Sequence, residues 1–275
     1  KYRFRAFFEG ATKLIQDAYW RDDADYFFSE AEEWLMRIAD YVEGNINLFH
    51  QGCDQVDELV QNKIDGVFSD KLKCGIPWYD HEFGGFERGR FDVLGARPGQ
   101  GKSASVECAI DYMGSNGIPC GLFERDMTVK KLVMRMACRR AGITMTSAMR
   151  GGATADQYRS IRTHVNALRK LPIYVENPPR MTGIDVGYAV RRMVARHGIQ
   201  FFAVDHFQVM TPADRDQRIG MTINATELKK TVHNNNVGSL ILGHLNREIE
   251  RRGSDKPNIT SKPRPSDMKE CDQLY

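Results

Sequence analysis

The sequence contains no apolar run that approaches the roughly 20 residues of a membrane-spanning helix. Its first residues also lack the apolar segment of a secretory signal peptide. No two of its cysteines form a CxxC pair, and their spacing shows no regular disulfide framework, which is typical of reduced thiols. The cysteines are Cys53, Cys74, Cys108, Cys120, Cys138 and Cys271. We therefore expect a cytoplasmic protein, in a bacterial or phage-infected cell, with no membrane partner.

The sequence also has little net charge. A value of +3 is too small to identify nucleic acid as a partner from composition alone. The apolar fraction of 41% and the charged fraction of 27% are ordinary for a globular protein. A length of 275 residues suits one large domain and a small appendage, and because the chain begins at Lys1 we expect it to be part of a longer protein.

The first part of the chain has helical periodicity and no convincing strand. Two apolar stripes predict a helical hairpin over residues 1–44, as the end of an N-terminal domain. Residues 45–69 are expected to be a linker, in which Asp54 caps a short amphipathic helix. Its apolar positions are Val56, Leu59, Val60 and Ile64. Two interpretations of this helix remain open, because it either docks on a partner or folds back on its own domain.

From residue 70 to residue 275 the pattern alternates between strand and helix, after a turn-rich segment at 75–86. Strands are expected at 91–94, 120–123, 173–175, 201–205 and 239–242, and helices at 104–113, 128–141, 154–170, 182–196 and near 224–235. A polar, mobile loop is expected at 211–220. This alternation predicts an α/β fold with a mainly parallel sheet, in which ligands gather at the carboxyl ends of the strands.

The segment from Ala96 to Ser103 has the composition of a phosphate-binding loop. Gly99 and Gly101 would let backbone N–H groups converge on an anion at a helix N-terminus. Lys102 would reach the β- and γ-phosphates of ATP, and the Ser103 hydroxyl would contact Mg²⁺. The expected ATP-binding residues are Arg97, Pro98, Gly99, Gln100, Gly101, Lys102, Ser103 and Ala104. The alternative is a glycine-rich turn with an incidental lysine, since the strict pattern has Gly at Ala96.

Polar residues end three of the predicted strands. Asp205 would support the Mg²⁺ complex from the side opposite Ser103. Glu124 and Asp126 follow the strand at 120–123, and their period-2 spacing places them on one face. One of the two would orient the attacking water, with Asp126 preferred. His244 is either a polar sensor of the γ-phosphate or the cap of a turn.

These motifs occur in one order between residues 75 and 270. They are Gly75-Ile76-Pro77, Gly84-Gly85-Phe86, Ala96-Arg97-Pro98 with Gly101-Lys102-Ser103, Phe123 with Asp126-Met127, Leu132 to Met136, Val204-Asp205 with Gln208-Val209-Met210, Leu245-Asn246-Arg247, and Ser266 to Glu270. The series resembles the DnaB-type replicative DNA helicases, hexameric RecA-fold motors that include shorter phage versions. An ordered series of this kind is far more specific than any single motif.

The resemblance implies a RecA-like P-loop ATPase domain preceded by a helical stem and a linker helix. It implies a homohexamer that uses ATP and Mg²⁺ on single-stranded DNA, with primase and a helicase loader as further partners. Asp126 stands at the position of the family's catalytic glutamate, and His244 stands at that of its γ-phosphate sensor. The residues implied to be catalytic are Lys102, Glu124, Asp126 and His244, and those implied to contact DNA are Arg247, Lys269, Glu270 and Asp272.

Two other functions fit the same residues. One is a RecA/KaiC-like DNA-dependent ATPase that assembles without unwinding. The other is a nucleotide-binding structural module without turnover, which is suggested by the shorter carboxylate at Asp126. A further reason to consider it is that the sequence stops at Tyr275, before the C-terminal strands that would carry the family's inter-subunit arginine finger.

Overall fold

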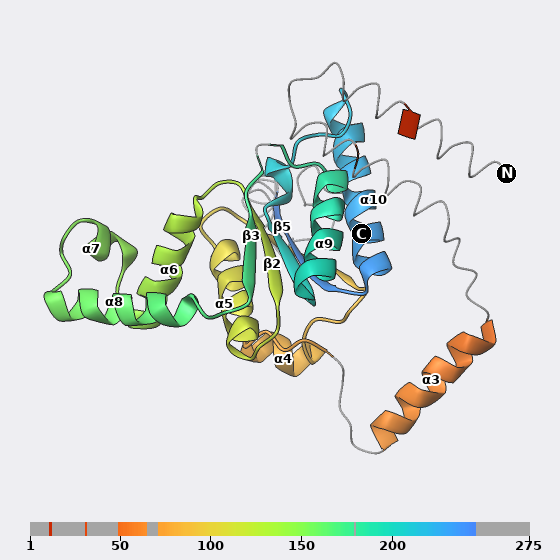
Figure 1. The fold of residues 1–275 in the computed structure, drawn as a ribbon, viewed down its shortest axis with the longest axis horizontal. Coiled ribbons are helices and arrows are strands. Elements are labelled where there is room, and N and C mark those ends of the chain that lie inside the picture. Colours follow the sequence, from red (N-terminus) through yellow and green to blue (C-terminus); the bar gives the residue numbers. More distant parts are fainter. Residues whose placement is uncertain (1–10, 13–30, 32–48, 65–70, 179, 246–275) are drawn as a thin grey trace, which may run out of the picture. The chain divides into compact units, whose positions relative to one another are not determined.

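The computed structural model describes residues 11, 12, 31, 49–64, 71–178 and 180–245 (Figure 1). The chain divides into two compact units, residues 1–68 and residues 69–275, each of which is described by itself. The hairpin predicted over residues 1–44 lies outside the described residues, apart from residues 11, 12 and 31, which are helical.

Within the first unit, the linker helix of the sequence analysis is present as α3, Phe49–Ile64. The helix begins before Asp54, so this residue is not its N-cap, and Gly52 does not interrupt it. Val56, Val60 and Ile64 are exposed at 61%, 45% and 72%. Because residues four apart lie on one face of a helix, these three side chains form an exposed apolar row.

The second unit is built on a five-stranded sheet with the order β1-β5-β4-β2-β3 (Figure 1). The strands are β1 (Phe91–Ala96), β2 (Cys120–Glu124), β3 (Ile173–Glu176), β4 (Phe201–Asp205) and β5 (Gly238–His244). All pairings between neighbouring strands are parallel. The α/β fold with a parallel sheet, predicted from the sequence, is therefore confirmed, with β4 at the centre.

Helices cover both faces of this sheet (Figure 1). On one face lie α4 (Pro77–Phe83) and α5 (Lys102–Ser115), and on the other lie α9 (Gly183–His197) and α10 (Gln217–Asn235). Successive residues of the central strand β4 pack alternately into two cores. Phe201 and Ala203 pack into the α5 core, whereas Phe202 and Val204 pack into the α9–α10 core. A strand buried on both faces needs such a continuous apolar sequence.

A helical extension connects β2 to β3 and projects from the α5 side of the sheet (Figure 1). It consists of α6 (Val129–Ala141), α7 (Met145–Met149) and α8 (Ala155–Leu168). A small apolar cluster of its own joins the three helices, formed by Ala137, Cys138, Ala148 and Ile161. The short helix α7 was not expected from the sequence.

An ion cluster joins α6 to α5. Glu107 and Asp111 of α5 are only 2% and 7% exposed. Arg135 pairs with Glu107, while Asp111 accepts hydrogen bonds from Arg139 Nη2 at 2.7 Å and from Arg140 Nε at 3.0 Å. Buried carboxylates are stable only with partners of this kind. The cluster therefore fixes the helical extension to the helix that follows the phosphate-binding loop.

Two segments differ most from the sequence expectation. Helix α10 begins at Gln217 instead of near residue 224, because the Asp216 carboxylate accepts hydrogen bonds from the N–H groups of Arg218 and Ile219 at 2.9 and 3.2 Å. The polar loop expected at 211–220 is correspondingly shorter. The turn-rich segment at 75–86 contains α4, which starts with Pro77 and ends at Phe83, followed by the C-cap Gly84 at a φ of 75°.

The contact between α9 and α10 gives a first testable prediction. A β-carbon on Gly183 would lie 2.5 Å from the carbonyl oxygen of Asn224, a backbone atom that cannot rotate away. We expect Gly183→Ala to lower the free energy of unfolding by about 2 kcal/mol, as measured by urea denaturation. Gly52→Ala on α3 is the control, because nothing lies within 4 Å of the added β-carbon. Equal losses in both variants would contradict the assigned packing.

Candidate active site

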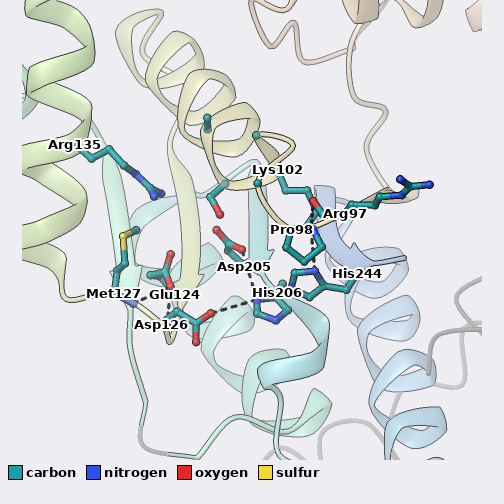
Figure 2. Close-up of a pocket in the computed structure, with 14 residues that line it drawn as sticks. Arg97, Pro98, Lys102, Glu124, Asp126, Met127, Arg135, Asp205, His206 and His244 are labelled. Atoms are coloured by element: carbon teal, nitrogen blue, oxygen red, sulfur yellow. Dashed lines mark hydrogen bonds and ion pairs between the residues drawn. The ribbon is translucent and has the colours of Figure 1, made fainter. Parts of the chain in front are cut away.

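Polar side chains gather where the central strands end, around a cavity of about 440 Å³ (Figure 2). This volume lies within the roughly 300–1,000 Å³ of small-molecule sites. The cavity is lined by Arg97, Pro98, Gly99, Gly101, Lys102, Ser103, Ala104, Glu124, Asp126, Met127, Arg135, Asp205, His206 and His244. The structure therefore brings together every residue that was predicted to bind ATP or Mg²⁺ or to be catalytic, except Gln100.

The loop between β1 and α5 has the geometry of an anion-binding turn. Gly99 and Gly101 have φ values of 80° and 86°, a conformation that favours glycine. The Gln100 side chain stays within the loop, since its Oε1 accepts a hydrogen bond from the N–H of Arg97 at 2.9 Å. Ala96 is the last residue of β1, so its methyl group lies on the strand that precedes the turn. A glycine is therefore not required at Ala96.

Lys102 is the first residue of α5 and only 7% exposed. Its Nζ donates hydrogen bonds to the carbonyl oxygens of Ala96 at 2.7 Å and Arg97 at 3.3 Å, and lies 3.0 Å from His244 Nδ1. Burial lowers the pKa of Lys102, and the nearby Asp205 carboxylate opposes this shift. The ammonium group is thus held beneath the loop, beside the last residue of β5 (Figure 2).

Two carboxylates lie side by side on neighbouring strands of the sheet. Glu124 of β2 pairs in register with Asp205 of β4, and both are buried, at 2% and 7% exposure. Glu124 Oε1 accepts hydrogen bonds from the N–H groups of Asp126 at 2.8 Å and Met127 at 3.1 Å. Burial, with the Asp205 charge as the next cause, raises the pKa of Glu124 to about 7. Glu124 therefore holds the β2–α6 loop and shares its site with a second negative charge.

Asp126 does not lie on the strand, which corrects the expectation that Glu124 and Asp126 share one strand face. Strand β2 ends at Glu124, and Asp126 follows in the loop. Its carboxylate Oδ2 lies 3.4 Å from His206 Nδ1, and the side chain is 59% exposed. Both carboxylates nevertheless reach the same cavity, by different routes.

Three lining residues, Met127, Arg135 and His206, had no role in the sequence analysis. His206 directly follows β4, and burial lowers its pKa against the opposing effect of the Asp126 and Asp205 charges. The residue after a parallel strand is a signal that would have identified it. Arg135 reaches the cavity from α6 while pairing with Glu107 of α5. Arg135 reaches the cavity because α6 packs against α5, and the sequence alone does not predict that packing.

The residues predicted to bind DNA lie outside the described part of the chain. They are Arg247, Lys269, Glu270 and Asp272. Their assignment stays a prediction.

The model of the DnaB-like helicase C terminal domain family matches residues 71–274. The chain belongs to this family. Among curated relatives of the family, the replicative DNA helicase DnaC of Bacillus subtilis is 25% identical over 262 residues, 91% of this chain and 57% of the relative. The replicative DNA helicase DnaB of Geobacillus stearothermophilus gives 25% over 260 residues with the same coverage. The chain thus spans just over half the length of these relatives.

Solved structures share the fold of this chain. One is described as a DnaB-like replicative helicase and its interactions with primase, with a TM-score of 0.77, 19% identity, and coverage of 99% of this chain and 63% of that one. A second, described as an ATPase domain, gives a TM-score of 0.72 at 20% identity, covering 84% of this chain and 80% of that one. The RecA-like fold expected from the sequence is confirmed by these matches.

Family membership implies a nucleotide and Mg²⁺, and the donors present fit that pair. Mg²⁺ takes oxygen ligands and is commonly bound by one or two protein groups together with phosphates. The Ser103 hydroxyl and the Asp205 carboxylate line one cavity with the phosphate-binding loop. Across the residues that the structure covers, no group of three or more His, Cys, Asp or Glu side chains could hold a metal by itself. The site therefore suits a metal held jointly with a nucleotide.

Among the described residues, no helix is both long enough and apolar enough to cross a bilayer.

The raised pKa of Glu124 predicts how stability changes with pH. Between its ordinary pKa of 4.5 and the folded value of about 7, the folded protein holds a proton that the unfolded chain has lost. The contribution of Glu124 to the free energy of unfolding therefore falls as pH rises through this window, by at most about 3 kcal/mol. Glu124→Gln removes this titration and keeps an Oε1 acceptor. We expect it to exceed the wild type in stability at pH 8 but not at pH 4.5.

Urea denaturation of both proteins in EDTA measures this difference. Glu227→Gln, at a side chain that is 30% exposed on α10, is the control. Parallel pH profiles for wild type and Glu124→Gln would contradict the prediction.

Proposed function

We propose that this chain is the ATP-hydrolysing part of a replicative DNA helicase, which moves on single-stranded DNA as a homohexamer and unwinds duplex at the fork. The observation that carries the proposal is the convergence of the phosphate-binding loop, Asp205 and Asp126 on one cavity in a chain of the DnaB-like family. A turn alone could be incidental, whereas a phosphate-binding loop beside one carboxylate at the end of β4 and another in the β2–α6 loop supplies the groups that phosphoryl transfer needs.

In this proposal the loop residues bind the nucleotide. Backbone N–H groups around Gly99 and Gly101 and the N-terminus of α5 face the phosphates. Lys102 contacts the β- and γ-phosphates from its position beneath the loop. Ser103 and Asp205 hold the Mg²⁺, which neutralises charge on the phosphate oxygens.

The remaining groups act on the attacking water and on the phosphate state. Asp126 is the preferred residue to orient the water, since its exposed carboxylate projects into the cavity from a loop. Glu124 is the second candidate. His244 contacts Lys102 and ends β5, directly before Leu245 and the segment that carries the predicted DNA-binding residues. This position suits a sensor that links the phosphates to DNA.

Primase and a helicase loader complete the proposed set of partners. A similar solved structure describes a DnaB-like replicative helicase and its interactions with primase, which supports primase as a partner here.

Two assays on the full-length protein test the function. ATP hydrolysis with and without single-stranded DNA comes first, because a structural module would show no turnover. Strand displacement on a forked duplex comes second. Stimulated hydrolysis without displacement would favour a RecA/KaiC-like ATPase that assembles without unwinding, and absence of hydrolysis would overturn the proposal.

The apolar row on α3 predicts how the ring is held together. If α3 docks on a neighbouring subunit, Val60→Asp with Ile64→Asp will weaken the oligomer, because each buried apolar side chain contributes about 1.5–3 kcal/mol before association costs. Sedimentation with a non-hydrolysable ATP analogue measures the change. Glu58→Lys, at an exposed position on the other face of the helix, is the control for a charge change. An unchanged oligomer in the double variant would mean that α3 packs on its own subunit.

A further inference from the structure

His206 lies between two carboxylates of the cavity. Its Nδ1 is 3.4 Å from Asp126 Oδ2 and 3.9 Å from Asp205 Oδ1, and its side chain is 15% exposed (Figure 2). The proposed function does not use this residue.

The backbone around Asp126 is held by hydrogen bonds, whereas its side chain is less restrained. Glu124 Oε1 binds its N–H group, and Arg125 Nη1 ties the same loop to the carbonyl oxygen of Val209 at 2.7 Å and to Thr211 Oγ1 at 3.2 Å. The backbone on either side of Asp126 is therefore anchored. An aspartate that is 59% exposed still has several staggered rotamers, and only some of them face the cavity.

The His206 ring is itself held in place. It packs edge-to-face on the His244 ring, with centroids 4.2 Å apart and an interplanar angle of 83°. His244 Nδ1 in turn lies 3.0 Å from Lys102 Nζ. A continuous series of contacts thus runs from the lysine beneath the phosphate-binding loop, through two imidazoles, to the carboxylate of Asp126.

We propose that His206 is a positioning residue for ATP hydrolysis, whose Nδ1–H holds the Asp126 carboxylate toward the cavity. This inference rests on the proposed function. In the reaction, the water oxygen forms a bond to the γ-phosphorus, the bond to the bridging oxygen breaks with its electron pair passing to ADP, and Asp126 accepts the proton of the water. A carboxylate held in one rotamer performs this step more often than a freely rotating one.

The test compares three variants of the full-length protein in steady-state ATP hydrolysis with Mg²⁺ and single-stranded DNA. His206→Phe keeps a ring but removes the donor, and we expect kcat to fall about 10- to 100-fold with KM within about twofold. His206→Asn restores an N–H donor near the Nδ1 position, so its kcat should lie well above that of His206→Phe. His233→Phe, in the last turn of α10 and outside the cavity lining, is the matched control.

A double-mutant cycle separates positioning from packing. With Asp126→Asn present, His206→Phe should cause little further loss of kcat, because the two residues act as one unit. The same fold loss in both backgrounds, or an unchanged kcat for His206→Phe, would overturn the inference. Binding of a non-hydrolysable ATP analogue and thermal unfolding show whether each variant is folded, and His206→Asn provides the comparison if His206→Phe is not.

The two proposals fail in different ways. A wild-type protein without ATP turnover overturns the proposed function and the role of His206 together. Normal turnover that is lost with Lys102→Ala but retained with His206→Phe overturns only the role of His206.

Discussion

Replacing Lys102 with alanine will abolish ATP turnover. The ammonium group is buried and hydrogen-bonded to the carbonyl oxygens of Ala96 and Arg97, and Lys102 lines the cavity beside the phosphate-binding loop. The lost interaction is charge-assisted, and we expect it to remove at least ~2 kcal/mol of nucleotide affinity or transition-state stabilisation. Colorimetric phosphate release and titration of a fluorescent nucleotide measure the two effects.

Lys131→Ala, at an exposed position on α6, is the matched control and should retain wild-type turnover. Thermal unfolding shows whether Lys102→Ala is folded. Wild-type turnover in a folded Lys102→Ala protein would mean that the loop is not the phosphate site.

The second large effect is expected at Asp126. Asp126→Asn should lower kcat by ~10²-fold or more, the range for loss of a general base. Glu124→Gln should cost less than about tenfold, because the Gln Oε1 can still accept the hydrogen bonds of the Asp126 and Met127 N–H groups. Steady-state kinetics at saturating ATP separates the two.

The two carboxylates also differ in pH behaviour, which provides an independent check. Glu124 has a pKa of about 7, so a rate that depends on its ionised form would rise between pH 6 and pH 8. A larger loss of kcat in Glu124→Gln than in Asp126→Asn would reverse the assignment. Small losses in both would mean that another group orients the water.

The phosphate-binding loop could be predicted from the sequence because its chemistry is local. The consecutive residues from Arg97 to Ala104 carry the turn, the lysine and the hydroxyl, and no long-range contact is needed to recognise them. Strand ends were also predictable, since parallel strands collect their carboxyl ends at one edge. Asp205 and His244 were found in this way.

The missed features depend on where a strand stops. Alternation along β4 would send His206 to the face opposite Asp205, but the strand ends at Asp205 and the rule no longer applies. Asp126 departs from β2 for the same reason, because the hydrogen bonds to Glu124 Oε1 turn the chain after the last paired residue. The position of Arg135 depends on the packing of α6 against α5, which sequence periodicity alone does not predict.

The ion cluster between α5 and α6 should respond only weakly to changes in ionic strength. Its carboxylates are shielded from solvent, so dissolved salt screens these attractions far less than it screens charges in open water. Contacts with DNA phosphates, in contrast, weaken steeply as salt concentration rises. If the protein binds single-stranded DNA as proposed, moderately high salt should release it while the helix behind the phosphate-binding loop stays joined to the helical extension.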